Sequence, residues 1–170
     1  MKYKIFAFAL AAVLIVSFSS CNSCSKKKET REEQIQEFRS TLTKEDTTTM
    51  LKLCDDAMEQ LKNGQYEKVL SGLYEYTDSP QSVKPITPET KKHYLKMFKM
   101  FPVRDYHRIY YSFQLEGCND VKYKVTWATA EQAGTKDPAT TAYMFNPVKI
   151  DDKWHLCVKT LTDQIDETMR

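Results

Sequence analysis

The sequence predicts an α+β domain in which N-terminal helices pack on a curved antiparallel sheet. Before Pro102, apolar residues recur at the three- and four-residue spacing of helices. After Pro102, apolar and polar residues alternate with a period of two, which is typical of strands with one buried face. Because the helical segments come first and the strands follow one another closely, we expect the helices to cover the apolar face of a meander.

Residues 1–20 have the features of an export signal. Lys2 and Lys4 give a short cationic start, and the apolar run from Ile5 to Val16 is too short to span a bilayer. Small residues, Ser19 and Ser20 among them, then precede a cysteine. We therefore predict a signal peptide over 1–20 and not a transmembrane helix.

Cys21 follows these small residues and resembles the lipobox cysteine of bacterial lipoproteins, whose thiol is acylated after cleavage. The resemblance implies lipid attachment at Cys21, which would hold the chain on a membrane. Two alternatives stay open: an ordinary cleaved signal with an incidental cysteine, and acylation at Cys24. A redox role for the pair Cys21 and Cys24 is disfavoured, because the pair lies in a polar segment and not at the start of a helix in a strand–helix unit.

Residues 21–42 form a predicted acylated cysteine and polar tether, with helical character near Ile35 and Phe38. The run Lys26-Lys27-Lys28 is either a solvated part of this tether or a contact with anionic headgroups. Removing residues 1–20 takes away two lysines and no acid, so the mature chain is formally neutral. No basic stripe points to nucleic acid.

Residues 43–165 are predicted to form one domain, with ample aromatic material for a core: ten Tyr, eight Phe and two Trp. Four glycines are too few for a phosphate loop or a loop-rich disulfide scaffold. Beyond Cys21, the sequence leaves the disulfide status of the remaining cysteines open: Cys24, Cys54, Cys118 and Cys157.

Three helices are expected in this domain. The first starts at the capping box of Thr43 with Asp46 and stops at Asn63-Gly64; its apolar stripe includes Cys54, which we interpret as a small buried hydrophobe. The second places apolar residues from Tyr66 to Tyr74 on one face, followed by a proline-containing loop over 77–88. The third begins with Thr87-Pro88 and ends at Pro102.

The strands follow in order, and each has one apolar phase. Ile109, Tyr111, Phe113 and Leu115 share one face, and Val121, Tyr123, Val125 and Trp127 share the next. After a polar loop over 131–140, Tyr143 and Phe145 lead to Asn146-Pro147, where proline predicts a bulge or an edge. Val148 and Ile150 enter a tight turn at Asp151-Asp152, and Trp154, Leu156 and Val158 leave it.

Three helices with an aromatic-faced meander resemble the nuclear-transport-factor-2-like (SnoaL-like, cystatin-like) cone fold. The ending Val148-Lys149-Ile150-Asp151-Asp152-Lys153-Trp154-His155-Leu156 carries most of the resemblance, because it is similar to the hairpin that closes many members, small lipoproteins of unknown function included. Asp152 stands where glycine is commoner. The resemblance implies a cone-shaped domain, and this fold hosts lyases, isomerases, carriers and interaction domains alike.

No catalytic or metal-binding residue can be assigned from the sequence. The expected inward positions hold no acid, and the three histidines lie on polar phases without ligand spacing. Asp105 and His107 are two apart, so they share a strand face, but such pairs are common by chance. The candidate ligand-binding residues are aromatic and would line the mouth of an apolar pocket, unless they simply fill the core: Tyr111, Tyr123, Trp127 and Tyr143.

These observations lead to three hypotheses. The first is a non-enzymatic binding module for a partner protein or a small apolar ligand, lipid-anchored in the cell envelope. The segment after Cys21 is basic and lacks the acidic tract that resembles a surface-export signal in related lipoproteins, so we expect the periplasmic side of the outer membrane. The second is a lyase or isomerase acting inside the cone. The third is a structural part of a larger envelope complex, which predicts an exposed apolar patch on the outer side of the sheet. No cofactor and no nucleic acid partner is expected.

Overall fold

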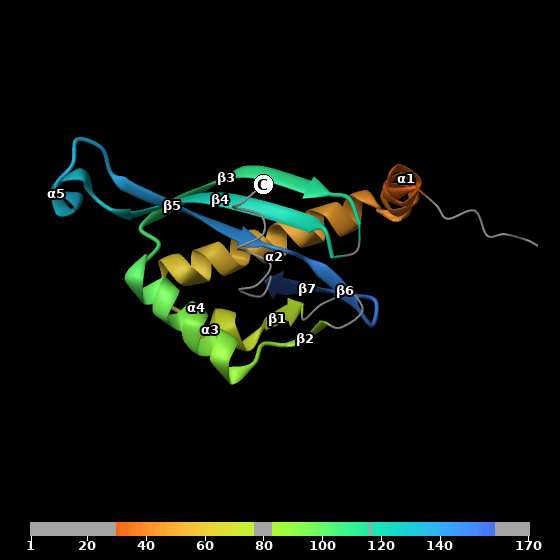
Figure 1. Ribbon diagram of the computed structural model, residues 1–170, viewed down its shortest axis with the longest axis horizontal. Coiled ribbons are helices and arrows are strands. Elements are labelled where there is room, and N and C mark those ends of the chain that lie inside the picture. The colour runs from red at the N-terminus through yellow and green to blue at the C-terminus, as the bar shows by residue number, and fades with distance from the viewer. Residues whose placement is uncertain (1–29, 77–82, 116, 159–170) are drawn as a thin grey trace, which may run out of the picture.

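The computed structural model describes residues 30–76, 83–115 and 117–158. Helices occupy the first part of this chain and most strands the second, and the strands curve around the longest helix (Figure 1). The predicted α+β class, with helices packed on a curved and mostly antiparallel sheet, is confirmed. The predicted signal peptide, Cys21, Cys24, the lysine run and residues 159–165 lie outside the described residues.

The first two helices are α1 (Arg31–Thr41) and α2 (Lys44–Lys62). The predicted capping box opens α2: the Thr43 hydroxyl accepts a hydrogen bond from the Asp46 backbone N–H at 3.0 Å, and Asp46 Oδ2 accepts one from the Thr43 N–H at 3.0 Å. Gly64, with φ +71°, follows the predicted stop. In α1, Phe38 packs against the core.

The second expected helix is shorter than the sequence predicts. Helix α3 (Tyr66–Ser71) ends before Gly72, and Leu73–Tyr76 forms strand β1. The prediction of helix through Tyr74 is therefore wrong, because β1 pairs in parallel with a strand some 80 residues later, a contact that local spacing cannot show. The expected loop over 77–88 also contains a strand, β2 (Val83–Pro85), paired antiparallel with β1.

Helix α4 (Pro88–Met100) begins and ends as expected. The Thr87 hydroxyl accepts from the Thr90 N–H at 3.2 Å, and Pro88 occupies the first turn. Tyr94 and Phe98 are the buried residues of this helix. It packs beside α3 and contributes to one end of the core.

Strands β3 (Asp105–Phe113), β4 (Asn119–Ala128) and β5 (Ala139–Phe145) form an antiparallel sheet, with the short helix α5 (Ala130–Ala133) between β4 and β5. The register of β3 against β4 shifts between Arg108 and Tyr110. Because of this bulge, Arg108 is paired with buried Tyr123 and Tyr111 with buried Val121. The simple alternation predicts that Ile109 shares a buried face with Tyr111 and Phe113, but the bulge breaks this alternation, and of the three only Phe113 is buried.

The sheet bends at Asn146-Pro147, where the sequence predicts a bulge or an edge. Strand β6 (Val148–Ile150) continues β5 beyond this point and pairs with β7 (Lys153–Val158). The Asn146 N–H donates to Cys157 O at 2.8 Å, and its side-chain amide donates to Asp120 Oδ1 at 2.6 Å. The complete second sheet has the order β2-β1-β7-β6, with β1 and β7 parallel.

The core lies between α2, α3, α4 and the concave side of the strands. It consists largely of aliphatic, methionine and aromatic side chains. The fully buried ones include Met50, Met58, Leu61, Leu70, Leu73, Phe98, Val121, Tyr123, Val125 and Phe145. Cys54 is among them with no exposed surface, which confirms its interpretation as a buried small residue.

Candidate functional site

The two tyrosines at the centre of the predicted site are opposite each other in the sheet. Tyr123 in β4 is paired in register with Tyr143 in β5, and both rings are buried. The Tyr123 hydroxyl donates to Asp55 Oδ1 at 2.6 Å, and the Tyr143 hydroxyl donates to Phe101 O at 2.6 Å. Both side chains thus fill the core while their polar ends bond to neighbouring elements.

The other two predicted residues lie apart from this pair. The Trp127 ring packs edge-on against Phe101, with centroids 5.3 Å apart. Tyr111 is 52% exposed on edge strand β3 and contacts Phe113. The structure thus brings Tyr123 and Tyr143 together but places Tyr111 and Trp127 elsewhere, and a ligand-binding role for the four stays a prediction.

A polar cluster that the sequence does not reveal joins α2 to the concave side of β3 and β4. Arg108 Nη1 donates to both oxygens of Asp55, at 3.2 and 3.1 Å, while Tyr123 donates to one of them. The Asp55 and Arg108 side chains are 45% and 31% exposed. Buried Tyr123 and this half-exposed ion pair therefore form the boundary between the core and solvent.

The cluster continues along the next turns of α2. The Tyr106 hydroxyl donates to Glu59 Oε2 at 3.2 Å, and Lys62 Nζ lies 5.8 Å from the Tyr106 ring centroid and 3.6 Å from Asp105. The sequence indicates the helical half of this cluster, because positions 55, 59 and 62 lie at helical spacing beside the apolar stripe. The sequence does not indicate the half of the cluster that lies on β3, because the bulge at Ile109 places Arg108 on the concave side, against the simple alternation.

Both tyrosines in the cluster are held as neutral donors. Burial, then the hydrogen bond to Asp55, raises the pKa of Tyr123 far above its ordinary value. Burial, then the hydrogen bond to Glu59, raises the pKa of Tyr106 to about 12. The cluster therefore holds the Asp55 carboxylate against one hydroxyl group and the guanidinium group, and the Glu59 carboxylate against the other hydroxyl group.

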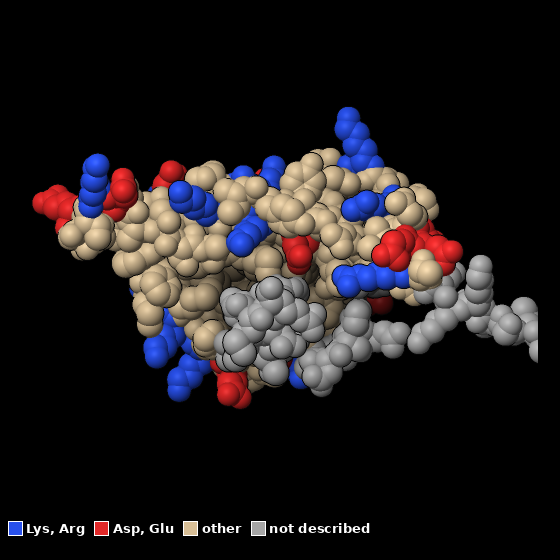
Figure 2. Space-filling model, turned by 45° about the horizontal axis from the view of Figure 1, so that its top comes forward, with Lys and Arg blue, Asp and Glu red and all other residues tan. Residues whose placement is uncertain are grey.

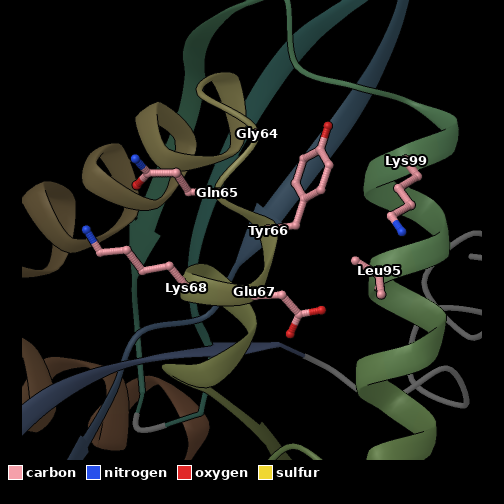
Figure 3. Close-up of a pocket in the computed structure, with 7 residues that line it drawn as sticks. All are labelled: Gly64, Gln65, Tyr66, Glu67, Lys68, Leu95 and Lys99. Atoms are coloured by element: carbon pink, nitrogen blue, oxygen red, sulfur yellow. The ribbon is translucent and has the colours of Figure 1, made fainter.

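A surface cleft of about 360 Å³ separates α3 from α4. Figure 3 shows Tyr66 and Glu67 on the side facing Leu95 and Lys99 of α4, while Lys68 extends away from α4. Glu67 is bound across the cleft by Lys91 at 2.8 Å, and the Tyr66 ring stacks on Phe98. This cleft lies at the surface, and Glu67 is already paired with Lys91. The cleft therefore shows no preference for a class of ligand.

A second cleft, of about 250 Å³, lies between α1 and the β6–β7 hairpin. Trp154 Nε1 donates to Asp46 Oδ1 at 2.8 Å, and Lys149 lies 3.9 Å from the same oxygen. Hydrogen bonds from Thr43 and then from Trp154 lower the pKa of Asp46 to about 2. Apolar side chains of Phe38 and Leu42 complete the cleft.

Among the described residues, the histidines and cysteines do not form a reactive group. His107 is exposed, His93 packs edge-on against Tyr94, and the His155 ring lies 4.8 Å from that of Tyr74. Asp105 is bound by Lys62.

The thiols of Cys54, Cys118 and Cys157 are free, and burial raises the pKa of Cys157 to about 12 and that of Cys54 further. Within the described ranges, no group of three or more His, Cys, Asp and Glu side chains could hold a metal ion.

The fold and this cluster define an α+β domain whose concave side carries buried side chains and a polar rim. The solved structures that are similar to it include two NTF2-like proteins. One is an NTF2-like protein of Campylobacter jejuni described as a candidate transpeptidase, with 14% identity, a TM-score of 0.37, and coverage of 64% of this chain and 96% of that one. The other is an NTF2-like protein of unknown function from Shewanella oneidensis MR-1, with 15% identity, a TM-score of 0.40, and coverage of 67% and 98%.

These similarities carry no inference about what the chain binds or catalyses. No family model matches the chain, and no curated protein matches it either. In the part of the chain that the structure describes, no helix has the length and apolar character needed to cross a membrane.

Proposed function

We propose that the chain is a lipid-anchored module of the cell envelope that binds a partner protein. The anchor rests on the sequence: a cationic start, a short apolar run and small residues before Cys21. Nine residues separate Cys21 from the start of α1 at Arg31, and most of them are polar. They act as the tether, and the periplasmic side of the outer membrane is the proposed location.

The observation that carries the binding role is the contrast between the buried side chains of the concave side and an exposed strand. The concave side is occupied by buried side chains, Tyr123, Phe145 and Phe98 among them. Of the four large hydrophobic residues that are exposed in the described ranges, three are consecutive in β3: Ile109, Tyr110 and Tyr111. Exposed aromatic residues gathered on one strand are typical of protein interfaces, whereas a small apolar ligand needs an enclosed pocket.

Co-purification of the full chain with its partner tests this role. Tyr111→Ser should release at least 90% of a partner that is retained in stoichiometric amount by the native chain. Met100→Ser is the matched control, because Met100 is also 52% exposed but lies at the end of α4, away from β3. Equal retention by the two variants, or the lack of any stoichiometric partner, would contradict the proposal.

The anchor is tested separately by fractionation. Cys21→Ser should move the protein from the membrane fraction to the soluble fraction, because the acylation site is lost. Cys24→Ser should leave it on the membrane. The opposite pattern would assign the anchor to Cys24. If both variants stay in the membrane fraction, the proposal of a lipid anchor on a single cysteine is wrong.

A second function, a lyase or isomerase, is favoured by one observation: the carboxylate of Asp55 lies 2.6 Å from the Tyr123 hydroxyl at the rim of the concave side. Under this alternative, the chain would catalyse deuterium exchange from solvent into small carbonyl acids, measured by NMR. Asp55→Asn should abolish the exchange, while Asp56→Asn, one residue away and exposed, should retain it. Absence of exchange in the native chain rejects the enzyme.

A further inference from the structure

The convex side of the three-stranded sheet is a second surface that no described helix covers. Figure 1 shows α2 on one side of β3, β4 and β5, and no described helix on the other. The register places two rows of side chains on this convex side. We call them the outer sheet face: Tyr110, Lys122 and Met144 in one row, and His107, Lys124 and Ala142 in the other.

This face has two lysines beside an exposed ring. Lys122 and Lys124 are exposed, and neither forms an ion pair with any described residue. Two acids lie at the ends of the strands: Asp105 is bound by Lys62, and Asp120 accepts a hydrogen bond from the Asn146 amide. Figure 2 shows Lys and Arg side chains spread over the sheet region, with most acidic side chains toward the ends of the molecule.

The ring is that of Tyr110, which is 49% exposed and opposite Lys122 in the register. Tyrosine is enriched among the residues that dominate binding at protein interfaces, because it buries a large area with few rotatable bonds. Lysines around such an anchor steer an oppositely charged partner toward it. A tyrosine flanked by two unpaired lysines therefore fits an apolar side chain with acids on either side.

Strand β3 also offers main-chain groups. It has nine residues and pairs only with β4 among the described strands, so one of its edges is open. A polypeptide can pair with such an edge, whereas lipid headgroups cannot. The bulge at Ile109 interrupts the strand, which disfavours long unspecific pairing between edges.

We propose that the outer sheet face binds an acidic segment of a partner protein, with an apolar side chain against Tyr110 and carboxylates at Lys122 and Lys124. This inference rests on the proposed function, since it names the chemical class of the partner and where it docks. The proposed function rests on the exposed residues of β3, and this inference extends the binding surface to the convex side of the sheet.

Photocrosslinking tests the inference in the full-length chain in its host. With p-benzoylphenylalanine in place of Tyr110, mass spectrometry should find adducts to a protein peptide with at least two Asp or Glu within four residues of the linked position. Lys122→Glu with Lys124→Glu should reduce the adduct at least ten-fold. The matched control is Lys92→Glu with Lys96→Glu on α4, where both lysines are exposed, and it should leave the adduct unchanged.

The remaining outcomes separate this inference from the proposed function. Adducts to lipid, to a second copy of the chain or to a segment without acids overturn the inference, as does an adduct that survives charge reversal. If the probe forms protein adducts at Tyr111 but not at Tyr110, the binding role stands and the acidic docking site falls. If it forms none at either position, both fall. Equal thermal midpoints of the two double variants confirm that folding is not the cause.

Discussion

The indole N–H of Trp154 donates to Asp46 Oδ1 at 2.8 Å, although the two residues are 108 positions apart. Asp46 also caps α2 through Thr43. One carboxylate therefore fixes both the start of the longest helix and the closing hairpin of the sheet. This contact connects the two halves of the chain, and its charge makes it sensitive to acid.

Asp46→Asn should weaken the fold at neutral pH but not in strong acid. The folded pKa of Asp46, about 2, lies below the ordinary value of 3.8, so its stabilising effect is present above pH 3.8 and is lost as the pH falls through 2. With solvent screening at this partly exposed site, we expect about 1 to 2 kcal/mol. Urea unfolding between pH 2 and pH 7 measures it.

Asp56→Asn is the control for this experiment. Asp56 lies on the same helix, but its side chain is 54% exposed and pairs only with Lys52. Its substitution should change the free energy of unfolding by less than about 0.5 kcal/mol at any pH. If both variants lose stability equally, the contact between Trp154 and Asp46 does not have the proposed role.

Asp152→Gly should stabilise the domain. Asp151 and Asp152 both have positive φ, 48° and 61°, in the two-residue turn between Ile150 and Lys153. Such a turn favours glycine at its second position, and we expect a gain of about 0.5 to 1 kcal/mol in the free energy of unfolding. Asp137→Gly, in the exposed loop before β5, should give no gain. A loss of stability in Asp152→Gly would contradict this account of the turn.

Tyr123→Phe should cost about 1 to 2 kcal/mol of stability, because it removes the buried hydroxyl that donates to Asp55. Tyr110→Phe, at an exposed ring, should change stability by less than about 0.5 kcal/mol. A double-mutant cycle with Asp55→Asn measures the coupling by urea unfolding. A coupling of zero would show that the hydrogen bond does not contribute.

Thiol labelling of the native chain should distinguish Cys118 from the buried cysteines. Cys54 and Cys157 have no exposed surface, and burial raises the pKa of both thiols. In a Cys24→Ser background, Cys118 should therefore react first with a thiol reagent at pH 8, at least a hundred-fold faster than the other two. Fast labelling of Cys54 without unfolding would contradict the described core.

Local signals predicted the ends of the helices well. Thr43 with Asp46, Asn63-Gly64 and Thr87-Pro88 each specify a boundary through neighbouring residues, and the structure has all three. The bend at Asn146-Pro147 was equally predictable, because proline cannot donate to a ladder.

Contacts between distant segments were not predictable. Leu73 and Tyr74 continue a helical spacing, but pairing with β7 makes them a strand. Asp55 and Arg108 meet across 53 positions, and the bulge at Ile109 reverses the strand phase on which such a prediction depends. The candidate site therefore follows from tertiary structure, whereas most of the fold follows from local sequence.

Mass spectrometry of the N-terminal peptide of the purified full chain tests the central claim most directly. The account predicts a mature chain that begins at Cys21, with the mass of at least two fatty acyl chains added to that residue. An unmodified Cys21 thiol, or a chain that still begins at Met1, would contradict it.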